Sequence, residues 1–254
     1  MTLTVDPDHL GTPEVAWRRS GRLARLAEWW PDLWPGRVVV VAPHPDDEIL
    51  GAAGILRRAS ALRVPVEVVS VTDGEAARRP AGLRHGVDLR DVREREARKA
   101  LRRLGVACER IRLGLPDGAV AEHERELAAF LVTRLRRGDL CVVPWTADGH
   151  PDHDACGRAA AIAASATGAQ QAAYLVWAWH WADPECDDLP WDQLVRLPLD
   201  GATRRRKRRA VAAHSSQLTP TVAGIPDSAV LPPDVVEHFR RPYEVYALDS
   251  RNGR

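Results

Sequence analysis

The stretch from Val38 to Gly51, V-V-V-V-A-P-H-P-D-D-E-I-L-G, joins an uninterrupted apolar run to one imidazole and three carboxylates. A short run that is apolar at every position is typical of a central parallel strand buried on both faces. We therefore expect a strand over 37–42, then a charged loop, then a helix over 49–62. Carboxylates this close together repel one another, so they require either solvent or a positive charge between them. The stretch thus predicts a buried strand that presents charged side chains at its carboxyl end.

Apolar strands and helices alternate on either side of this stretch. The expected strands cover 66–72, 110–115, 140–144, 174–179, 193–197 and 243–248, and the expected helices cover 89–104, 122–137, 155–166 and 204–214. Such alternation predicts an α/β fold, a Rossmann-like three-layer α/β/α sandwich around a mostly parallel sheet. With the first five strands in the order 3-2-1-4-5, the active site is expected at the carboxyl ends of strands 1 and 4.

The chain of 254 residues contains no internal repeat and no linker long enough to divide it. We expect a single domain over 1–254. Within it, residues 1–36 are predicted to be a helical lead-in, because apolar side chains recur at near-helical spacing between Val15 and Trp34.

Charge and composition narrow the range of partners. The formal net charge is +1 and the four cysteines are scattered without a C-x-x-C pair. These features argue against a nucleic-acid partner, an anionic membrane partner and a disulfide framework. The basic run from Arg204 to Arg209 is predicted to be a solvated helix face. With neither a signal pattern nor a long apolar segment, we expect a cytoplasmic protein without a membrane span, and a homo-oligomer remains open.

Two loops carry imidazole and carboxylate together. His44-Pro-Asp-Asp-Glu48 follows strand 1, and His150-Pro-Asp-His-Asp154 follows strand 4. Two or three histidines with a carboxylate are a ligand set that zinc accepts, with a position left open for water. Each loop alone is equally well explained by aspartates that cap the next helix. Their expected meeting at one crevice favours metal binding.

The motifs A-P-H-P-D-D-E and, about a hundred residues on, G-H-P-D-H resemble those of the PIG-L/LmbE family of zinc-dependent N-deacetylases. The resemblance extends over about 37–248. It implies one Zn²⁺ per chain, held by His44, Asp47 and His153, although iron, cobalt or nickel suit the same ligands. It also implies that Asp46 is the general base and that His150 polarises or protonates the reacting amide.

The resemblance implies a zinc-dependent hydrolase that removes an N-acyl group, most often acetyl, from an amino sugar or its conjugate. Asp46 would take a proton from a metal-activated water, and a cationic His150 would help to hold the developing oxyanion. An amidase of a larger thiol or natural-product conjugate remains open. A metal- or sugar-binding module without catalysis is the alternative of another class, but such a module would not need Asp46 and His150. The sequence leaves the substrate undefined.

Further residues are assigned by the same resemblance. Arg93, in a helix with the pattern R-x-x-E-x-x-x-A-x-x-x-L-G, and Asp117, in Leu-Pro-Asp-Gly, are expected to contact the substrate. A solvated helix face and an Asp-Gly turn are the simpler explanations. Asp148 departs from the aromatic residue that mycothiol-type members carry at this position. It is expected to bind substrate and to orient His150, two positions later, although loop polarity explains it equally well.

Two more polar residues and an aromatic cluster complete the candidates. Glu48 and His214, the latter in A-H-S-S-Q, are expected to support the site from behind, or else to cap or pack. Trp177, Trp179 and Trp181 alternate as if on one face of a strand. We expect at least one of these rings in the core and at least one at the rim, where it would stack on a sugar.

Overall fold

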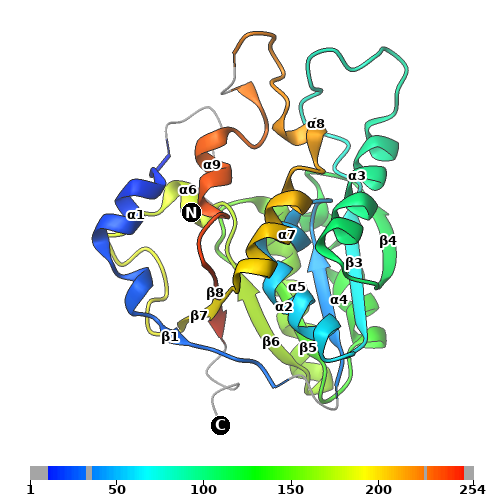
Figure 1. The fold of residues 1–254 in the computed structure, drawn as a ribbon. Helices are drawn as coiled ribbons and strands as arrows, with labels where there is room; N and C mark the ends of the chain where they lie inside the picture. Colours follow the sequence, from blue (N-terminus) through cyan, green and yellow to red (C-terminus); the bar gives the residue numbers. More distant parts are fainter. Residues whose placement is uncertain (1–10, 33–35, 226–227, 249–254) are drawn as a thin grey trace.

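The computed structural model describes residues 11–32, 36–225 and 228–248. Within these ranges the chain forms one eight-stranded sheet with helices on both faces (Figure 1). The strand order is β1-β7-β8-β6-β5-β2-β3-β4. The expected three-layer α/β architecture with a mostly parallel sheet is therefore confirmed.

The strands are β1 (Ala27–Glu28), β2 (Val38–Ala42), β3 (Val66–Thr72), β4 (Glu109–Leu115), β5 (Leu140–Pro144), β6 (Gln170–Tyr174), β7 (Leu194–Pro198) and β8 (Tyr243–Leu248). The longer helices are α2 (Asp47–Ala61), α3 (Leu89–Leu104), α4 (Glu124–Arg134), α5 (Pro151–Thr167) and α7 (Gly201–Val211). The short helices are α1 (Glu14–Ser20), α6 (Ala178–Trp181), α8 (Ser215–Leu218) and α9 (Pro233–His238), with 3₁₀ turns η1 (Leu23–Arg25) and η2 (Val120–His123).

The strand order reverses between β2 and β5. β2 pairs in parallel with β3 on one side and with β5 on the other. The helices that follow these strands separate accordingly: α2, α3 and α7 pack together on one face of the sheet, and α4 and α5 pack together on the other (Figure 1). Because parallel strands end at the same edge, the loops after β2 and β5 open into one crevice. The expected order of the first five strands is confirmed as β4-β3-β2-β5-β6.

The far side of the sheet breaks the parallel pattern. β8 runs antiparallel between β6 and β7, and β1 adds a two-residue parallel strand to β7. The structure therefore places the last strand of the chain inside the sheet and not at its edge.

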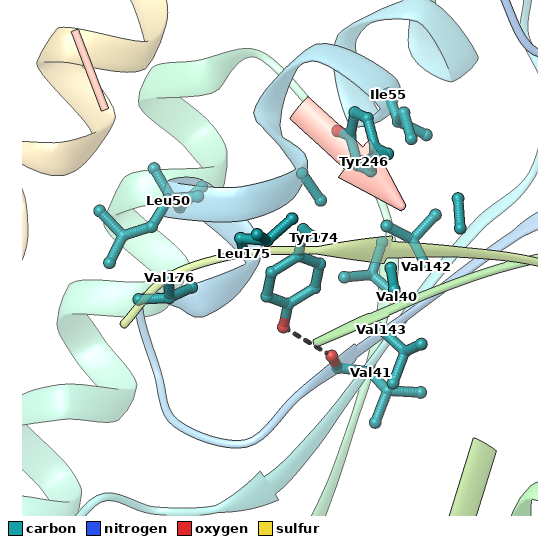
Figure 2. Close-up of a cluster of buried hydrophobic side chains, with 14 of the residues drawn as sticks. Val40, Val41, Leu50, Ile55, Val142, Val143, Tyr174, Leu175, Val176 and Tyr246 are labelled. Atoms are coloured by element: carbon teal, nitrogen blue, oxygen red, sulfur yellow. Dashed lines mark hydrogen bonds between the residues drawn. The ribbon is translucent and has the colours of Figure 1, made fainter. Parts of the chain in front are cut away.

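The core lies around β2, where all five residues are buried as the apolar run predicts. Figure 2 shows Tyr174 of β6 among buried side chains that include Val40, Val142 and Ile55. The hydroxyl of Tyr174 donates a 2.9 Å hydrogen bond to the carbonyl of Val41. This bond satisfies the phenol inside an apolar environment and fixes β6 against the end of β2, directly before the charged loop.

Helix α2 lies very close to the sheet because two of its residues have no side chain. A methyl group added at Gly51 would lie 2.2 Å from Cδ2 of Tyr174, and one added at Gly54 would lie 2.6 Å from Leu199. The small residues therefore permit the approach of α2 that sets the position of its charged first turn.

Two of the expected elements differ from the structure. Within the described part of the lead-in, the single helix over 15–34 is replaced by α1, η1 and β1; residues 1–10 and 33–35 lie outside the described residues. Helix α1 has only seven residues, because Pro13 precedes it and Gly21 ends it. The expected strand over 174–179 is also wrong, because β6 ends at Tyr174 and Trp179 and Trp181 belong to α6.

A buried ionic cluster holds the N-terminal helix. Glu14 of α1 accepts a 2.9 Å hydrogen bond from Nδ1 of His238 and a 2.6 Å bond from Arg241. Burial raises the pKa of Glu14, but the bonds to His238 and Arg241 outweigh it and lower that pKa to about 2. The carboxylate is therefore charged and joins α1 to the end of α9.

The described helices include none that combines the length and apolar character needed to cross a membrane.

Candidate metal centre and active site

The loops after β2 and β5 bring three histidines together. The ring centroid of His44 lies 4.8 Å from that of His150 and 5.3 Å from that of His153. The rings of His150 and His153 are 5.0 Å apart. Residues separated by about a hundred positions in the sequence thus meet because β2 and β5 are neighbours in the sheet.

His44, Asp47 and His153 form a compact set of ligand atoms. One ligand atom from each lies within 4.8 Å of the other two. Oδ2 of Asp47 is 3.3 Å from Nδ1 of His44 and 3.3 Å from Nε2 of His153. Asp47 is the first residue of α2 and also accepts the backbone N–H of His44, so the loop itself fixes its carboxylate.

Asp148 determines which nitrogen of His153 is free. Nδ1 of His153 lies 2.8 Å from Oδ2 of Asp148, and since a carboxylate only accepts, that nitrogen donates. Asp148 also accepts the backbone N–H groups of Val176, Trp177 and Ala178, which hold it in place. Nε2 of His153 is then the ring nitrogen that faces Oδ2 of Asp47, and it is buried without a hydrogen-bond partner among the described residues. A carboxylate–histidine pair of this kind is the usual support of a metal-ligating imidazole.

His44 is supported in a similar way on its other side. Its Nε2 is 3.1 Å from Asp117 and 3.2 Å from Asp152, while Nδ1 faces Asp47. Asp152 also accepts the backbone N–H groups of Gly118 and Val120. The loop after β4 and the start of α5 therefore orient the ring of His44.

A second group of possible ligands, His44, His150 and Asp152, overlaps the first. Its members are already engaged, because Asp152 accepts two backbone N–H groups and Nδ1 of His150 accepts the N–H of Asp152. The set with Asp47 and His153 keeps a free buried nitrogen, so it fits a metal ion better.

The charges of the cluster also suit a cation. Burial lowers the pKa of His44, but hydrogen bonds to Asp117, Asp152 and Asp47 outweigh it and raise that pKa well above its usual value. Burial likewise opposes protonation of His153, whereas Asp47 and Asp148 raise its pKa to about 9. The carboxylates thus stabilise positive charge at this position. A divalent cation bound to these three residues would supply that charge, and both imidazoles would then be neutral.

Asp46 lies beside this set without joining it. It is buried, and its Oδ2 is 3.2 Å from the guanidinium of Arg93. Burial raises its pKa to about 7, against the opposing charge of Arg93. Its backbone N–H donates to Glu48, which fixes the turn. The carboxylate is therefore held at the cavity wall by an arginine.

His150 differs from expectation in its charge. Burial, followed by the charges of His44 and His153, lowers the pKa of His150 to about 3. This low pKa favours a neutral ring at pH 7 over the expected cationic His150. Its Nδ1 accepts the N–H of Asp152, so the ring proton resides on Nε2. A neutral N–H donor is what His150 offers.

A cavity of about 220 Å³ opens onto these groups. Its lining includes His44, Asp46, Arg93, Asp117, His150 and Gln217. A second hollow of about 230 Å³ shares His150 and Trp177 with the first. Trp177 stacks on His150 with ring centroids 6.4 Å apart, while Trp179 is buried against Trp17. One tryptophan at the rim and one in the core agree with expectation, although a helix rather than a strand carries Trp179.

The remaining predicted residues lie at different depths. Arg93 and Asp117 line the cavity. Asp148 does not line the cavity. It is fully buried and its carboxylate bonds to His153, so it contacts neither the His150 ring nor the space for substrate as expected. Glu48 and His214 are also buried, and Oε1 of Glu48 and both ring nitrogens of His214 have no hydrogen-bond partner in the described part of the chain.

Two residues of the site were not predicted from the sequence. Asp152 orients His44 from the first turn of α5, where its spacing suits a helix cap equally well. Gln217 lines the cavity from α8. The only signal for Gln217 is its place in A-H-S-S-Q, the same pattern that singled out His214.

Comparison with known proteins agrees with this geometry. Residues 39–164 match the family described as GlcNAc-PI de-N-acetylase, PIG-L. A probable N-acetyl-α-D-glucosaminyl L-malate deacetylase 2 of Bacillus subtilis (strain 168) is 31% identical over 128 residues, which are 48% of this chain and 58% of the relative. The chain thus spans less than two thirds of that relative's length. The match confirms the family resemblance indicated by the two histidine motifs.

Solved structures share the fold. A conserved protein from Thermus thermophilus is 28% identical, with a TM-score of 0.56 over 80% of this chain and 84% of that chain. The A40926 pseudoaglycone deacetylase is 24% identical, with a TM-score of 0.61 over 84% of this chain and 96% of that chain.

Proposed function

Because residues 39–164 of this chain match the PIG-L family, we propose that the protein is a metal-dependent hydrolase that removes an N-acetyl group from an amino sugar or its conjugate. One observation carries the proposal. The set His44, Asp47 and His153 lies at the same cavity as a buried carboxylate, Asp46, and a neutral N–H donor, His150.

His44, Asp47 and His153 would hold the metal ion, and zinc suits two imidazoles and a carboxylate with an open position. When bound, such an ion acts as a Lewis acid and brings the pKa of a water molecule to about 7. The free Nε2 of His153 and the supporting bond from Asp148 favour this assignment.

Asp46 is the general base in this proposal. It accepts a proton from the attacking water and passes one to the amide nitrogen as the amine leaves. Arg93 holds its carboxylate at 3.2 Å and keeps it oriented toward the cavity. A base must lie next to the nucleophile without being consumed as a ligand, and Asp46 meets this requirement because its neighbour Asp47 supplies the ligand oxygen.

His150 stabilises the oxygen of the reacting amide. Its Nε2–H donates a hydrogen bond to the carbonyl oxygen as negative charge develops there. The ring is fixed by the N–H of Asp152 on one side and by Trp177 on the other. A fixed neutral donor needs no reorganisation during the reaction.

The proposed substrate is an N-acetylglucosaminyl compound. The Bacillus relative is named for such a sugar, and the polar wall formed by Arg93 and Asp117 suits a ring that carries hydroxyl groups. In this proposal the sugar ring occupies the first cavity, of about 220 Å³. The adjoining hollow beside Trp177 favours a second candidate, an amidase of a larger conjugate whose remaining part lies there.

Acetate release tests the proposal. Zinc-loaded protein should release acetate from at least one member of a panel of N-acetylglucosaminides that includes free N-acetylglucosamine and bulky conjugates. Turnover of bulky members alone would select the second candidate. Binding of panel members without acetate release from any of them would contradict both.

The first prediction concerns Asp46. Asp46→Asn should lower kcat by about 100- to 10,000-fold, because general base catalysis contributes on that order. The metal content, measured on the purified variant, should stay equal to that of the wild type. A fully active Asp46→Asn variant would exclude the role of Asp46 as the base.

A further inference from the structure

Gln217 lines the cavity and is held there by a chain of hydrogen bonds that begins at Glu96 on another helix. Gln217 and Ser216 belong to α8 and are buried, and Glu96 belongs to α3. The carboxylate of Glu96 accepts the backbone N–H of Ser216 at 2.8 Å and its hydroxyl at 2.6 Å. Nε2 of Gln217 donates in turn to the hydroxyl oxygen of Ser216 at 2.9 Å.

The proton order along this chain is fixed by chemistry. A carboxylate only accepts, so the single hydroxyl proton of Ser216 points to Glu96. The oxygen of Ser216 can then only accept, which requires the amide of Gln217 to present its NH₂ group to Ser216. The assignment of nitrogen and oxygen in the amide of Gln217 therefore follows from the network.

The other end of the amide is left as an acceptor. Oε1 of Gln217 is buried and has no hydrogen-bond partner among the described residues. Gln217 nevertheless lines the cavity, whose wall also includes Leu50 and Leu231, side chains that offer no donor. An unpaired buried carbonyl costs about 1–3 kcal/mol, so a network that holds one at a binding cavity indicates a ligand that supplies the donor.

The donor is most simply a hydroxyl group. In the proposed reaction the amide end of the substrate is taken up by Asp46 and His150, which come from the loops after β2 and β5. Gln217 comes instead from α8, which packs on α3. Away from its amide, an amino sugar carries hydroxyl groups as its hydrogen-bond donors.

We propose that Gln217 is a substrate-binding residue whose Oε1 accepts a hydrogen bond from one hydroxyl of the amino sugar, with Glu96 and Ser216 as its positioning residues. This inference rests on the proposed function. It names the sugar, rather than the acyl group, as the part of the substrate that Gln217 recognises.

The test combines variants with substrate analogues. Steady-state constants are measured for an N-acetylglucosaminide and its 3-, 4- and 6-monodeoxy analogues with the wild type, Gln217→Met, Ser216→Ala and Ser215→Ala. Ser215 is the matched control, since its hydroxyl also donates to Glu96, whereas the amide of Gln217 donates to Ser216. Thermal unfolding of each variant is recorded alongside.

One analogue should lose about 10- to 100-fold in kcat/KM with the wild type, because Oε1 is then left unpaired. Gln217→Met should lose a similar factor on the parent sugar and nothing further on that analogue. Ser216→Ala should reduce the ratio of kcat/KM for the parent sugar to kcat/KM for that analogue, and Ser215→Ala should retain the wild-type ratio. Ser216→Ala also tests the chain if Gln217→Met does not fold.

The role of Gln217 would be overturned if the wild type did not distinguish the parent sugar from any deoxy analogue in kcat/KM. It would also be overturned if Gln217→Met distinguished them as strongly as the wild type. In both cases the hydrolase proposal stands. Absence of acetate release from every sugar by the wild type would instead overturn the proposed function.

Discussion

At the scale of single residues, the site depends on which side chains are free to bind. His153 illustrates this, because its Nδ1–H donates a hydrogen bond to Asp148, which leaves Nε2 as the ring nitrogen that faces Asp47. Asp148 itself is held by three backbone N–H groups from the segment after β6. The carboxylate of Asp148 would therefore support the proposed metal site through His153, without touching metal or substrate.

The second prediction follows from this support. Asp148→Asn should weaken zinc affinity by about 10- to 100-fold, the usual loss when the partner of a ligating histidine is changed. Zinc titration against a competing chelator measures it. Asp139→Asn is the matched control, because Asp139 is a buried carboxylate that pairs with Arg37 just before β5. Equal affinities of the two variants would contradict the role of Asp148.

The meeting of the two motifs was predictable because each combines imidazole and carboxylate directly after a buried strand. The hydrogen-bond partner of Asp148, which is His153, was not predictable. Asp148 is two positions from His150 and five from His153, so nearness in sequence favoured the wrong histidine. Asp152 and Gln217 were missed because their roles depend on segments that meet them only in the fold.

At the scale of elements, the approach of α2 to the sheet positions the carboxylate of Asp47, the first residue of that helix. That approach exists because Gly51 lies against the ring of Tyr174. The same ring holds the carbonyl of Val41 at the end of β2 (Figure 2). Helix, strand and loop are therefore fixed by one contact.

The third prediction concerns this contact. Gly51→Ala should destabilise the fold by about 1–3 kcal/mol, because the added methyl overlaps the ring of Tyr174 and forces α2 outward. Chemical denaturation measures the change in the free energy of unfolding. Gly201→Ala is the control, since Gly201 is exposed at the start of α7 and an added methyl would meet only the flexible end of Arg205. A Gly51→Ala protein as stable as the wild type would show that α2 has room to move.

The fourth prediction concerns the joint between α1 and α9. The pKa of Glu14 is lowered from 4.5 to about 2 in the folded protein, so the charged form stabilises the fold above pH 4.5. That contribution, of about 3 kcal/mol, is lost as the pH falls from about 4.5 to about 2.

Glu14→Gln should remove this part of the acid dependence, so its free energy of unfolding should fall less steeply than that of the wild type between pH 4.5 and 2. Denaturant titrations across that range measure the slope. Glu126→Gln, at an exposed position of α4, should retain the wild-type slope. Parallel slopes of Glu14→Gln and the wild type would contradict the account.

At the scale of the whole molecule, the alternation of strands and helices predicted the parallel half of the sheet. The buried strands β2, β3 and β5 are continuous or nearly continuous apolar runs, which is why they could be recognised. β6 was misplaced because it begins with two glutamines and contains alanines, whereas the aromatic run after it looked more like a strand. The antiparallel insertion of β8 depends on pairing between distant segments, which no local pattern encodes.

The strand reversal between β2 and β5 was the part of the fold that located the site. It places both histidine loops at one edge of the sheet and leaves a cavity above them. The cavity itself was not predictable, because its wall includes α8 and the segment near Leu231, which contact each other only after folding.

The central claim is that His44, Asp47 and His153 together bind one divalent cation. Its most direct test is the stoichiometry of Zn²⁺ binding by metal-free protein, compared between the wild type, His153→Ala and Asp46→Asn. The account predicts one tightly bound ion per chain in the wild type and in Asp46→Asn, and no tight binding in His153→Ala. One ion bound by His153→Ala with wild-type affinity would contradict it.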